Sequence, residues 1–373
     1  MRPRPLIEAP LLTRRALNRA LLARQMLLER EDRPALDAIE RLGGLQSQAA
    51  SPPYLGLWTR LRDFRHQELA DLLLNRQAVR TALMRSTIHL VSSADALAWR
   101  PLIRPVAERM YESSHGRFLT GVDRDELSEV GRRLIEEQPQ TFEHLGATLS
   151  ERWPGNRPAS LANAIRTSCA LVQLPPRGIW GQSGPAVHAT IESWLGEPLA
   201  AEPDLAAFAK RYLAAFGPAS VRDLQTWSGL TRLQPVMELL RPELLTFQDE
   251  TGRELFDVPD APRPPAETPA PVRFLAEFDS TILAYADPRR IISTAARKRV
   301  VTVNGLVAGT FLVDGFVHGT WTIRREKSIS ILAIKPFLKI DRPDRVALEA
   351  EGFNLLAFAA AGLEPNVRFE DAT

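Results

Sequence analysis

Apolar residues recur every three or four positions over much of the first 240 residues, which is the spacing of one buried helix face. Proline and glycine mark several ends: Pro34 lies at a helix start, and Gly43-Gly44 forms a stop. Proline also stands in the first turn of the short helix predicted from residue 52. The predicted helices cover residues 12–30, 35–42, 52–61, 65–81, 141–153, 159–173, 220–230 and 231–241.

Extended segments lie between these helices. Residues 82–93 alternate between apolar and polar positions and are rich in β-branched side chains, which predicts a strand. Residues 174–181 have the extended, turn-rich character of a hairpin, and residues 244–249 and 254–259 flank a Glu-Thr-Gly-Arg turn. Helices followed by a strand or hairpin recur three times along the chain, and this order is typical of a winged helix. The repetition predicts three tandem winged-helix modules.

The pattern changes after residues 259–273, a proline-rich segment that predicts a linker. Beyond it, Asn304-Gly305 and Asp314-Gly315 separate alternating apolar runs and favour tight hairpin turns. A strand at residues 329–337 and a helix at residues 341–360 complete this part. The predicted fold class is therefore α+β, with three tandem winged-helix modules followed by a small antiparallel β domain that carries a C-terminal helix.

Four units follow from these patterns. The N-terminal helices and the first winged-helix module take residues 1–122, the second module residues 123–200, and the third residues 201–260. The linker and the C-terminal β-hairpin domain take residues 261–373.

Composition narrows the class of protein. The chain has 373 residues, 45% of them hydrophobic and 25% charged, as in a globular protein with sizeable cores. The segment MRPRPLIEAP lacks the apolar stretch of a secretion signal, no apolar run has the length of a membrane span, and Cys169 is the single cysteine. We therefore expect a cytoplasmic protein, associated with the nucleoid when it binds DNA. The net charge of +2 neither indicates nor excludes a nucleic-acid surface.

Metal and nucleotide chemistry are not indicated. The six histidines are scattered without the spacing of a zinc site, and no glycine-rich phosphate loop follows a strand. We expect no metal and no cofactor. Glu277 and Asp279 form the one apolar-flanked carboxylate pair of note, and hydrogen bonding to a turn or an arginine is the plainer interpretation.

An unusual pair of amides follows the Gly43-Gly44 stop. Gln46 and Gln48 flank Ser47, and by themselves they are readily interpreted as polar groups of a loop. Residues two apart share a face in a strand but diverge on a helix. The glycines allow the segment to leave helical geometry, so both side chains can converge on one point.

Five segments carry a more specific pattern: LGGLQSQAASPPYLGLW, RSTIHLVSSAD, LPPRGIWGQSG, FGPASVRDLQTWSGL and LAEFDSTILAYADPRR. Together, from about residue 10 to 360, they resemble the AlkZ-like family of tandem winged-helix proteins, typified by azinomycin-resistance DNA glycosylase. The resemblance implies excision of N7-alkylated guanines, including interstrand crosslinks and bulky natural-product adducts, in base-excision repair or antibiotic self-resistance. It also implies a catalytic glutamine, aliphatic residue, glutamine motif, matched here by Gln46 and Gln48 and departed from at Ser47.

Two neutral amides suit such a substrate. Alkylation at N7 makes guanine cationic, so the purine leaves as a neutral base and needs no general acid. The protein has to place a water at C1′ and tolerate positive charge on the sugar, and an amide can accept from that water and orient it. No lysine lies near Gln46 in the sequence, and the chain has only five lysines, so a Schiff-base lyase reaction has little support.

Candidate DNA contacts are basic residues close to predicted turns. Arg85 and His89 share one face of the predicted strand, although a buried, satisfied histidine is nearly as well supported. Arg177 lies in the second wing beside Trp180, a residue more typical of a core. Arg297, Lys298 and Arg299 form the densest basic cluster, at the base of a predicted hairpin, where a solvated charge run is the usual explanation.

These interpretations define two hypotheses. The first is a monomeric, monofunctional DNA glycosylase whose partner is double-stranded DNA containing alkylated purines. The alternative is a non-enzymatic winged-helix DNA-binding protein or transcriptional regulator. Such regulators usually dimerise on palindromic sites, and the sequence shows no heptad or apolar dimer helix.

Overall fold

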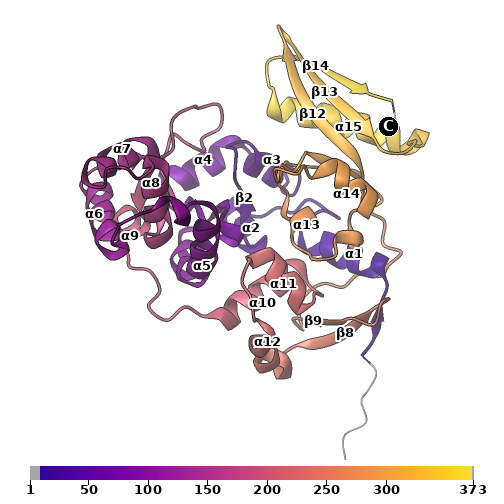
Figure 1. Ribbon diagram of the computed structural model, residues 1–373. Coiled ribbons are helices and arrows are strands. Elements are labelled where there is room, and N and C mark those ends of the chain that lie inside the picture. Colours follow the sequence, from indigo (N-terminus) through magenta and orange to yellow (C-terminus); the bar gives the residue numbers. More distant parts are fainter. Residues whose placement is uncertain (1–8, 372–373) are drawn as a thin grey trace, which may run out of the picture.

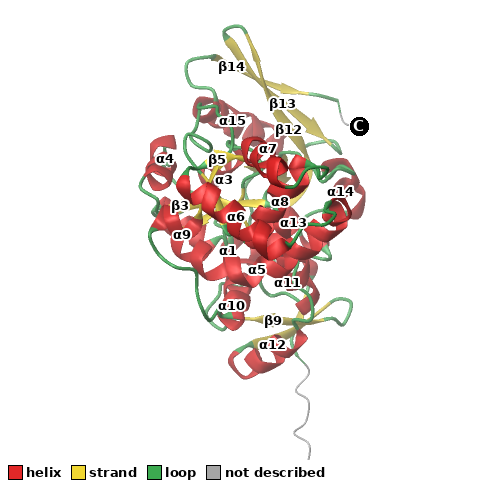
Figure 2. Cartoon of the chain, turned by 60° about the vertical axis from the view of Figure 1, so that its left-hand side comes forward, coloured by secondary structure: helices red, strands yellow, loops and turns green. Residues whose placement is uncertain are grey.

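The computed structural model describes residues 9–371 and shows a mixed α+β protein (Figure 1). The first eight residues, which include most of the segment in which we expected no secretion signal, lie outside the described residues. Within the described part, no helix combines the length and apolar character needed to cross a membrane. The β8–β9 hairpin (Leu245–Asp249 and Glu254–Asp257) and strands β12–β14 (Phe316–Glu326, Ile329–Pro336 and Glu364–Phe369) lie at opposite ends of the molecule (Figures 1 and 2).

The N-terminal half forms one six-stranded sheet with helices around it. Its strand order is β2-β4-β3-β6-β7-β5, and all of its pairings are antiparallel. The strands are β2 Leu45–Gln46, β3 Ala78–Ala82, β4 Ile88–Ser92, β5 Gln140–Thr141, β6 Leu171–Gln173 and β7 Val187–Thr190. The helices are α1 Arg14–Arg24, α2 Ala35–Arg41, α3 Pro52–Trp58, α4 His66–Leu74, α5 Ser93–Ser114, α6 Arg124–Glu137, α7 Phe142–Arg152, α8 Pro158–Ser168 and α9 Ile191–Leu195. Since β3 pairs with β6, this single sheet contains strands from both the first and the second predicted module.

Two predicted helices end early and are followed by a strand. The helix expected over residues 65–81 ends at Leu74, and Ala78–Ala82 forms β3 instead, with all five residues buried. Arg76 adopts a left-handed conformation with φ of 60°, which reverses the chain before the strand. Likewise, the helix expected over residues 159–173 ends at Ser168, and β6 follows. Burial on both faces of these strands removed the alternation that would have revealed them.

The third predicted module contains its two predicted helices and its hairpin, and a further helix, which the sequence analysis did not predict, precedes them. Helices α10 Leu205–Phe216, α11 Val221–Ser228 and α12 Gln234–Leu240 precede the antiparallel β8–β9 hairpin. A short strand, β1 Leu11–Leu12, pairs in parallel with β8 and makes this a three-stranded sheet. Ser220 caps α11 by accepting from the backbone N–H of Asp223, and the Asp223 side chain accepts from the N–H of Ser220 in return.

The C-terminal part is a five-stranded sheet with one long helix against it. Short helices α13 Ser280–Leu283 and α14 Thr294–Val300 precede its hairpins, β10 Arg273–Leu275 and β11 Thr310–Val313 are its first strands, and α15 is Arg342–Ala359. The turn at Asp314-Gly315 has φ of 47° and 81°, as the sequence predicts for a tight hairpin. The prediction of an antiparallel domain is wrong in one pairing, because β14 runs parallel to β13. Helix α15 supplies the crossover that a parallel pair requires.

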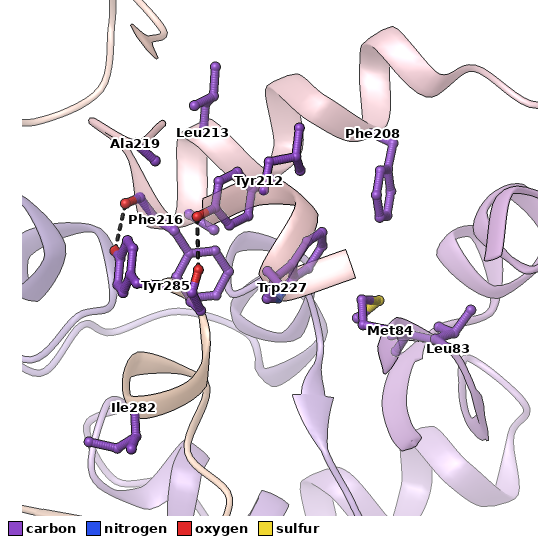
Figure 3. Packing of buried hydrophobic residues seen from close by; sticks show 14 of the residues in the cluster. Leu83, Met84, Phe208, Tyr212, Leu213, Phe216, Ala219, Trp227, Ile282 and Tyr285 are labelled. Atoms are coloured by element: carbon purple, nitrogen blue, oxygen red, sulfur yellow. Dashed lines mark hydrogen bonds between the residues drawn. The ribbon is translucent and has the colours of Figure 1, made fainter. Parts of the chain in front are cut away.

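An aromatic core joins the third predicted module to the C-terminal part. Phe208, Tyr212, Phe216 and Trp227 pack together with ring centroids 5.1–5.8 Å apart (Figure 3). The Tyr212 hydroxyl donates to the carbonyl oxygen of Ala284 at 2.9 Å, and the Tyr285 hydroxyl donates to that of Phe216 at 2.6 Å (Figure 3). Met84, in the turn between β3 and β4, belongs to the same core and brings that turn against α11.

Candidate active site

The two glycines before Gln46 make the local geometry possible. Gly43 and Gly44 have φ of 67° and 85°, a left-handed conformation that ends α2 and turns the chain into β2. A Cβ atom on Gly44 would lie 2.6 Å from Cγ1 of Val91, so this position also requires glycine for space. The predicted departure from helical geometry is therefore present at these residues.

Gln46 lies in β2, directly opposite His89 of β4. Its side chain is largely buried, with 7% of the residue exposed. The Oε1 atom accepts a 2.8 Å hydrogen bond from the guanidinium of Arg85. One amide oxygen lone pair and both amide N–H groups of Gln46 remain available to a ligand by this count.

Gln48 lies on the same edge but is exposed. Its Oε1 accepts from the backbone N–H of Ile88 at 3.2 Å, while the N–H of Ser47 donates to the Ile88 carbonyl oxygen at 2.7 Å. The carbonyl oxygen of Ser47 accepts a 2.7 Å hydrogen bond from Arg80. Both amides are thus held against the start of β4, one beneath the surface and one at it.

Arg80 is a residue that our sequence interpretation missed. It is 2% exposed, and no described residue accepts a hydrogen bond from its Nε or Nη1. Burial lowers its pKa to about 10, and the nearby charge of Arg177 adds to this effect. The sequence offered little indication that Arg80 is buried, because an arginine in this segment is equally compatible with the exposed face of a helix.

Arg85 occupies an unusual backbone position. It has φ of 55°, and Ser86 after it has φ of 58°. Besides its bond to Gln46, the Arg85 guanidinium donates to the carbonyl oxygen of Trp227 in α11 at 2.5 Å. Burial lowers its pKa to about 10, which leaves it cationic at neutral pH. We had expected a DNA contact, whereas the structure gives this guanidinium two partners within the protein.

His89 is buried beside Gln46, with 1% of the residue exposed. Its Nδ1 lies 3.0 Å from the carbonyl oxygen of Thr87, and Nε2 has no hydrogen-bond partner among the described residues. Burial, with a further contribution from the charge of Arg85, lowers the pKa of His89 to about 3. The imidazole is therefore neutral at physiological pH.

The other predicted DNA contacts lie elsewhere. Arg177 is half-buried and donates to the carbonyl oxygen of Gly184 at 3.2 Å. The cluster of Arg297, Lys298 and Arg299 lies in the last turn of α14, where Lys298 and Arg299 are exposed. The Arg299 guanidinium lies 4.0 Å from the centre of the Phe337 ring.

The two apolar-flanked carboxylates have different surroundings. Asp279 is buried, forms a 2.9 Å ion pair with Arg60, and caps α13 through the backbone N–H of Thr281. This agrees with the plain structural interpretation of the pair. Glu277 instead lines a pocket, and partial burial raises the pKa of its carboxyl group. No three or more of the described histidine, cysteine, aspartate and glutamate side chains are grouped as metal ligands.

Comparison with known protein families gives a match over most of the chain. The sequence model of the AlkZ-like DNA glycosylases matches residues 39–358, so the chain belongs to this family. It is similar to an interstrand DNA cross-link repair glycosylase of Streptomyces sahachiroi, with 26% identity over 356 residues that cover 88% of this chain and 92% of the relative. The fold is similar to the solved structure of the DNA glycosylase AlkZ of Streptomyces sahachiroi, with a TM-score of 0.77 at 21% identity, over 96% of this chain and 100% of that one.

Proposed function

We propose that the protein is a monofunctional DNA glycosylase that hydrolyses the N-glycosidic bond of cationic N7-alkylguanine in double-stranded DNA. The observation that carries this proposal is the hydrogen bond from Arg85 to Gln46, with Gln48 held on the same edge by Ile88. The hydrogen bond from Arg85 fixes the orientation of the Gln46 amide. The amide N–H groups therefore have a defined direction before the substrate binds. Such prior positioning is what a water-directing group needs.

Hydrolysis of this bond requires a positioned water molecule but no general acid. The alkylated guanine carries its positive charge before cleavage, and the bonding electrons of the breaking C1′–N9 bond neutralise it. The Gln46 and Gln48 amides accept from and orient the attacking water, whose oxygen becomes bonded to C1′ and whose proton is released to solvent. Neutral His89 and the ion-paired Asp279 take no part in this reaction. The first lysine in the sequence is Lys210, and neither Gln46 nor Gln48 hydrogen-bonds to a lysine.

The rest of the proposal concerns how DNA is held. The helices and hairpins form three tandem winged-helix modules that cradle the duplex as a monomer, and Arg177, Arg297, Lys298 and Arg299 contact its phosphates. The Streptomyces sahachiroi relative is named for interstrand cross-link repair. We extend that role, and self-resistance to an alkylating antibiotic in the cytoplasm, to this chain as part of the proposal. A winged-helix regulator remains the alternative, and it would bind DNA without releasing a base.

One experiment separates the two functions. The purified protein is incubated with a duplex that carries a single N7-methylguanine, and the supernatant is analysed by mass spectrometry for free 7-methylguanine. A glycosylase releases the base in proportion to time and enzyme, and leaves an intact strand with an abasic site. Binding of the duplex without released base would support the regulator and overturn the proposed reaction.

A further inference from the structure

A pocket of about 420 Å³ is lined in part by residues that closely follow Gln48 in the sequence. The chain runs from Gln48 directly into its wall, because Ala50 and Ser51 line it at the start of α3. Trp180, from the loop after β6, and Trp321, from β12, line it as well. The pocket thus lies where the N-terminal helices meet the C-terminal sheet, and Leu55 of α3 packs into the core of that sheet.

Both tryptophans are fixed by the protein. The Trp180 ring centroid lies 4.3 Å from that of His66 and 5.3 Å from that of Tyr54, and the backbone N–H of Trp180 donates to the Tyr54 hydroxyl. The Trp321 indole N–H donates to the carbonyl oxygens of Leu275 and Thr310 at 2.9 and 3.0 Å. Neither ring therefore has to be ordered at a cost in entropy when a ligand enters.

Glu277 is the one carboxylate among the described residues that line this pocket. Its carboxylate has no hydrogen bond or ion pair with any described residue, in contrast to Asp279 two positions later. Arg325 also lines the pocket and carries the opposite charge, and its guanidinium hydrogen-bonds to the carbonyl oxygen of Ala359 at 3.4 Å. An unpaired carboxylate that lines the same pocket as two indole rings is complementary to a planar cation that carries hydrogen-bond donors.

An N7-alkylated guanine has this chemistry. Alkylation spreads positive charge over the ring, which strengthens its attraction to an indole face, and the N1–H and the 2-amino group form a fork of two donors on one edge. We propose that the pocket binds the guanine ring of a nucleotide that carries a simple N7-alkyl group, with no link to the opposite strand, and is turned out of the duplex, with Glu277 accepting from this donor fork and Trp180 and Trp321 contacting the ring. This inference rests on the proposed glycosylase function and assigns the residues that recognise its substrate.

The pocket also favours release of the product. Cleavage of the C1′–N9 bond neutralises the purine, so the attraction to Glu277 and to the indole rings weakens as soon as the reaction is complete. Differential binding of this kind favours the charged substrate over the neutral base. The selectivity for alkylated guanine then has two sources: the leaving-group chemistry at the amides and the charge of the ring at Glu277.

The test measures binding without DNA, so it does not depend on base excision. The full chain is titrated with 7-methylguanosine and, separately, guanosine in mildly acidic buffer, and tryptophan fluorescence or calorimetry gives each Kd. We expect 7-methylguanosine to bind roughly tenfold or more tightly than guanosine, and Glu277→Gln to remove most of this difference. Glu137→Gln, an isosteric change at an exposed position of α6, is the matched control and should leave both Kd values unchanged.

Two further variants make each outcome decisive. Trp180→Leu should weaken binding of 7-methylguanosine if the ring is contacted, and circular dichroism checks that the variant is folded. Gln46→Ala should lower base release from DNA by about 10²-fold or more yet bind 7-methylguanosine as the wild type does. Equal Kd values for the two nucleosides, in a protein that excises 7-methylguanine from DNA, would overturn the pocket and leave the glycosylase proposal standing. Discrimination between the nucleosides without any excision would overturn the proposed reaction instead.

Discussion

The guanidinium of Arg85 joins Gln46 to α11, with one nitrogen 2.8 Å from the amide oxygen of Gln46 and another 2.5 Å from the carbonyl oxygen of Trp227. The amide proposed to direct water is therefore held by a residue of the β3–β4 turn that is itself anchored in the third predicted module. Excision depends on this connection if positioning is the chief catalytic contribution of the site.

Substituting Arg85 should lower the rate of excision more than the affinity for DNA. Arg85→Gln removes the forked donor and leaves Gln46 free to rotate, and we expect a fall in kcat of about tenfold to 10²-fold with little change in KM. Arg85→Lys retains one charged donor and should recover part of the rate. Single-turnover kinetics on N7-methylguanine DNA measures both, with the exposed Arg62→Ala as control. A change in KM alone would instead indicate the direct DNA contact that the sequence suggested.

Removing either amide should affect chemistry and leave binding intact. Gln46→Ala and Gln48→Ala are each expected to lower base release by about 10²-fold or more, as loss of a positioning group does. Gln67→Ala, at an exposed position of α4 where the side chain hydrogen-bonds to Asp71, is the matched control. Wild-type excision rates in both site variants would show that the catalytic assignment is wrong.

The sequence predicted those features of the site that depend on neighbouring residues in the chain, and it missed those that depend on contacts with distant residues. The turn at Gly43-Gly44 and the extended course of Gln46 follow from local backbone preferences, and both are present. The roles of Arg80 and Arg85 depend on partners far away in sequence, at Ser47 and Trp227, and no local pattern encodes them. The sequence left open whether His89 is a DNA contact or a buried residue. In the structure it is buried, because its strand pairs with Gln46 on one side and Thr81 on the other.

The same distinction explains the fold. Capped helices such as α11 and the tight turn at Asp314-Gly315 agree with the predictions, because their signals lie within a few residues. Strands β3 and β6 were read as helix ends, since β3 is buried on both faces, Arg80 included, and its pairing with β6 joins segments that lie far apart in the sequence. The parallel strand β14 was missed because it follows a long helix and pairs through a crossover.

Two buried histidines should make the protein less stable in mild acid. Burial lowers the pKa of His89 to about 3 and that of His188 to about 4, from an ordinary value of 6.5. Below about pH 6.5 the unfolded chain therefore binds more protons than the folded one, and the free energy of unfolding falls by up to about 1.4 kcal/mol per pH unit for each histidine. The loss should level off once the pH passes below each folded pKa.

Urea unfolding at a series of pH values tests this expectation. Replacing His188 by asparagine removes one titrating group, and the difference in unfolding free energy between wild type and variant should change with pH by up to that amount. The difference isolates the histidine from the carboxylates that titrate in the same range. A constant difference from pH 7 to about pH 4 would show that His188 keeps its ordinary pKa in the folded protein.

The basic cluster of α14 should set part of the salt dependence of DNA binding. Replacing Arg297, Lys298 and Arg299 together by alanine is expected to weaken binding to any duplex and to reduce the salt slope by up to about three phosphate equivalents. Single substitutions serve as internal controls: exposed Lys298 should account for about one equivalent, and half-buried Arg297 for less. An unchanged slope in the triple variant would place the cluster away from the DNA.

The selectivity among damaged bases provides the strictest test of the proposed amide mechanism. If Gln46 and Gln48 only direct water, excision should follow how good a leaving group the base already is. Cationic N7-alkylguanine and N3-alkyladenine should be released, whereas uracil, 8-oxoguanine and hypoxanthine should remain, because no group in the proposed site protonates them or stabilises a departing anion. A series of duplexes that differ only in the lesion, assayed for released base, provides the measurement.

Efficient removal of uracil would require a general acid, which the proposed site lacks. The structure limits which residues could supply this acid. His89 is neutral, with a pKa of about 3, and cannot donate a proton near neutral pH, while Asp279 is held in an ion pair with Arg60. Glu277 remains, because desolvation raises the pKa of its carboxyl group and it lines the pocket that Ala50 and Ser51 border. In that case Glu277→Gln should abolish uracil release while excision of cationic N7-methylguanine, which needs no acid, continues at a rate limited by weaker binding of the base.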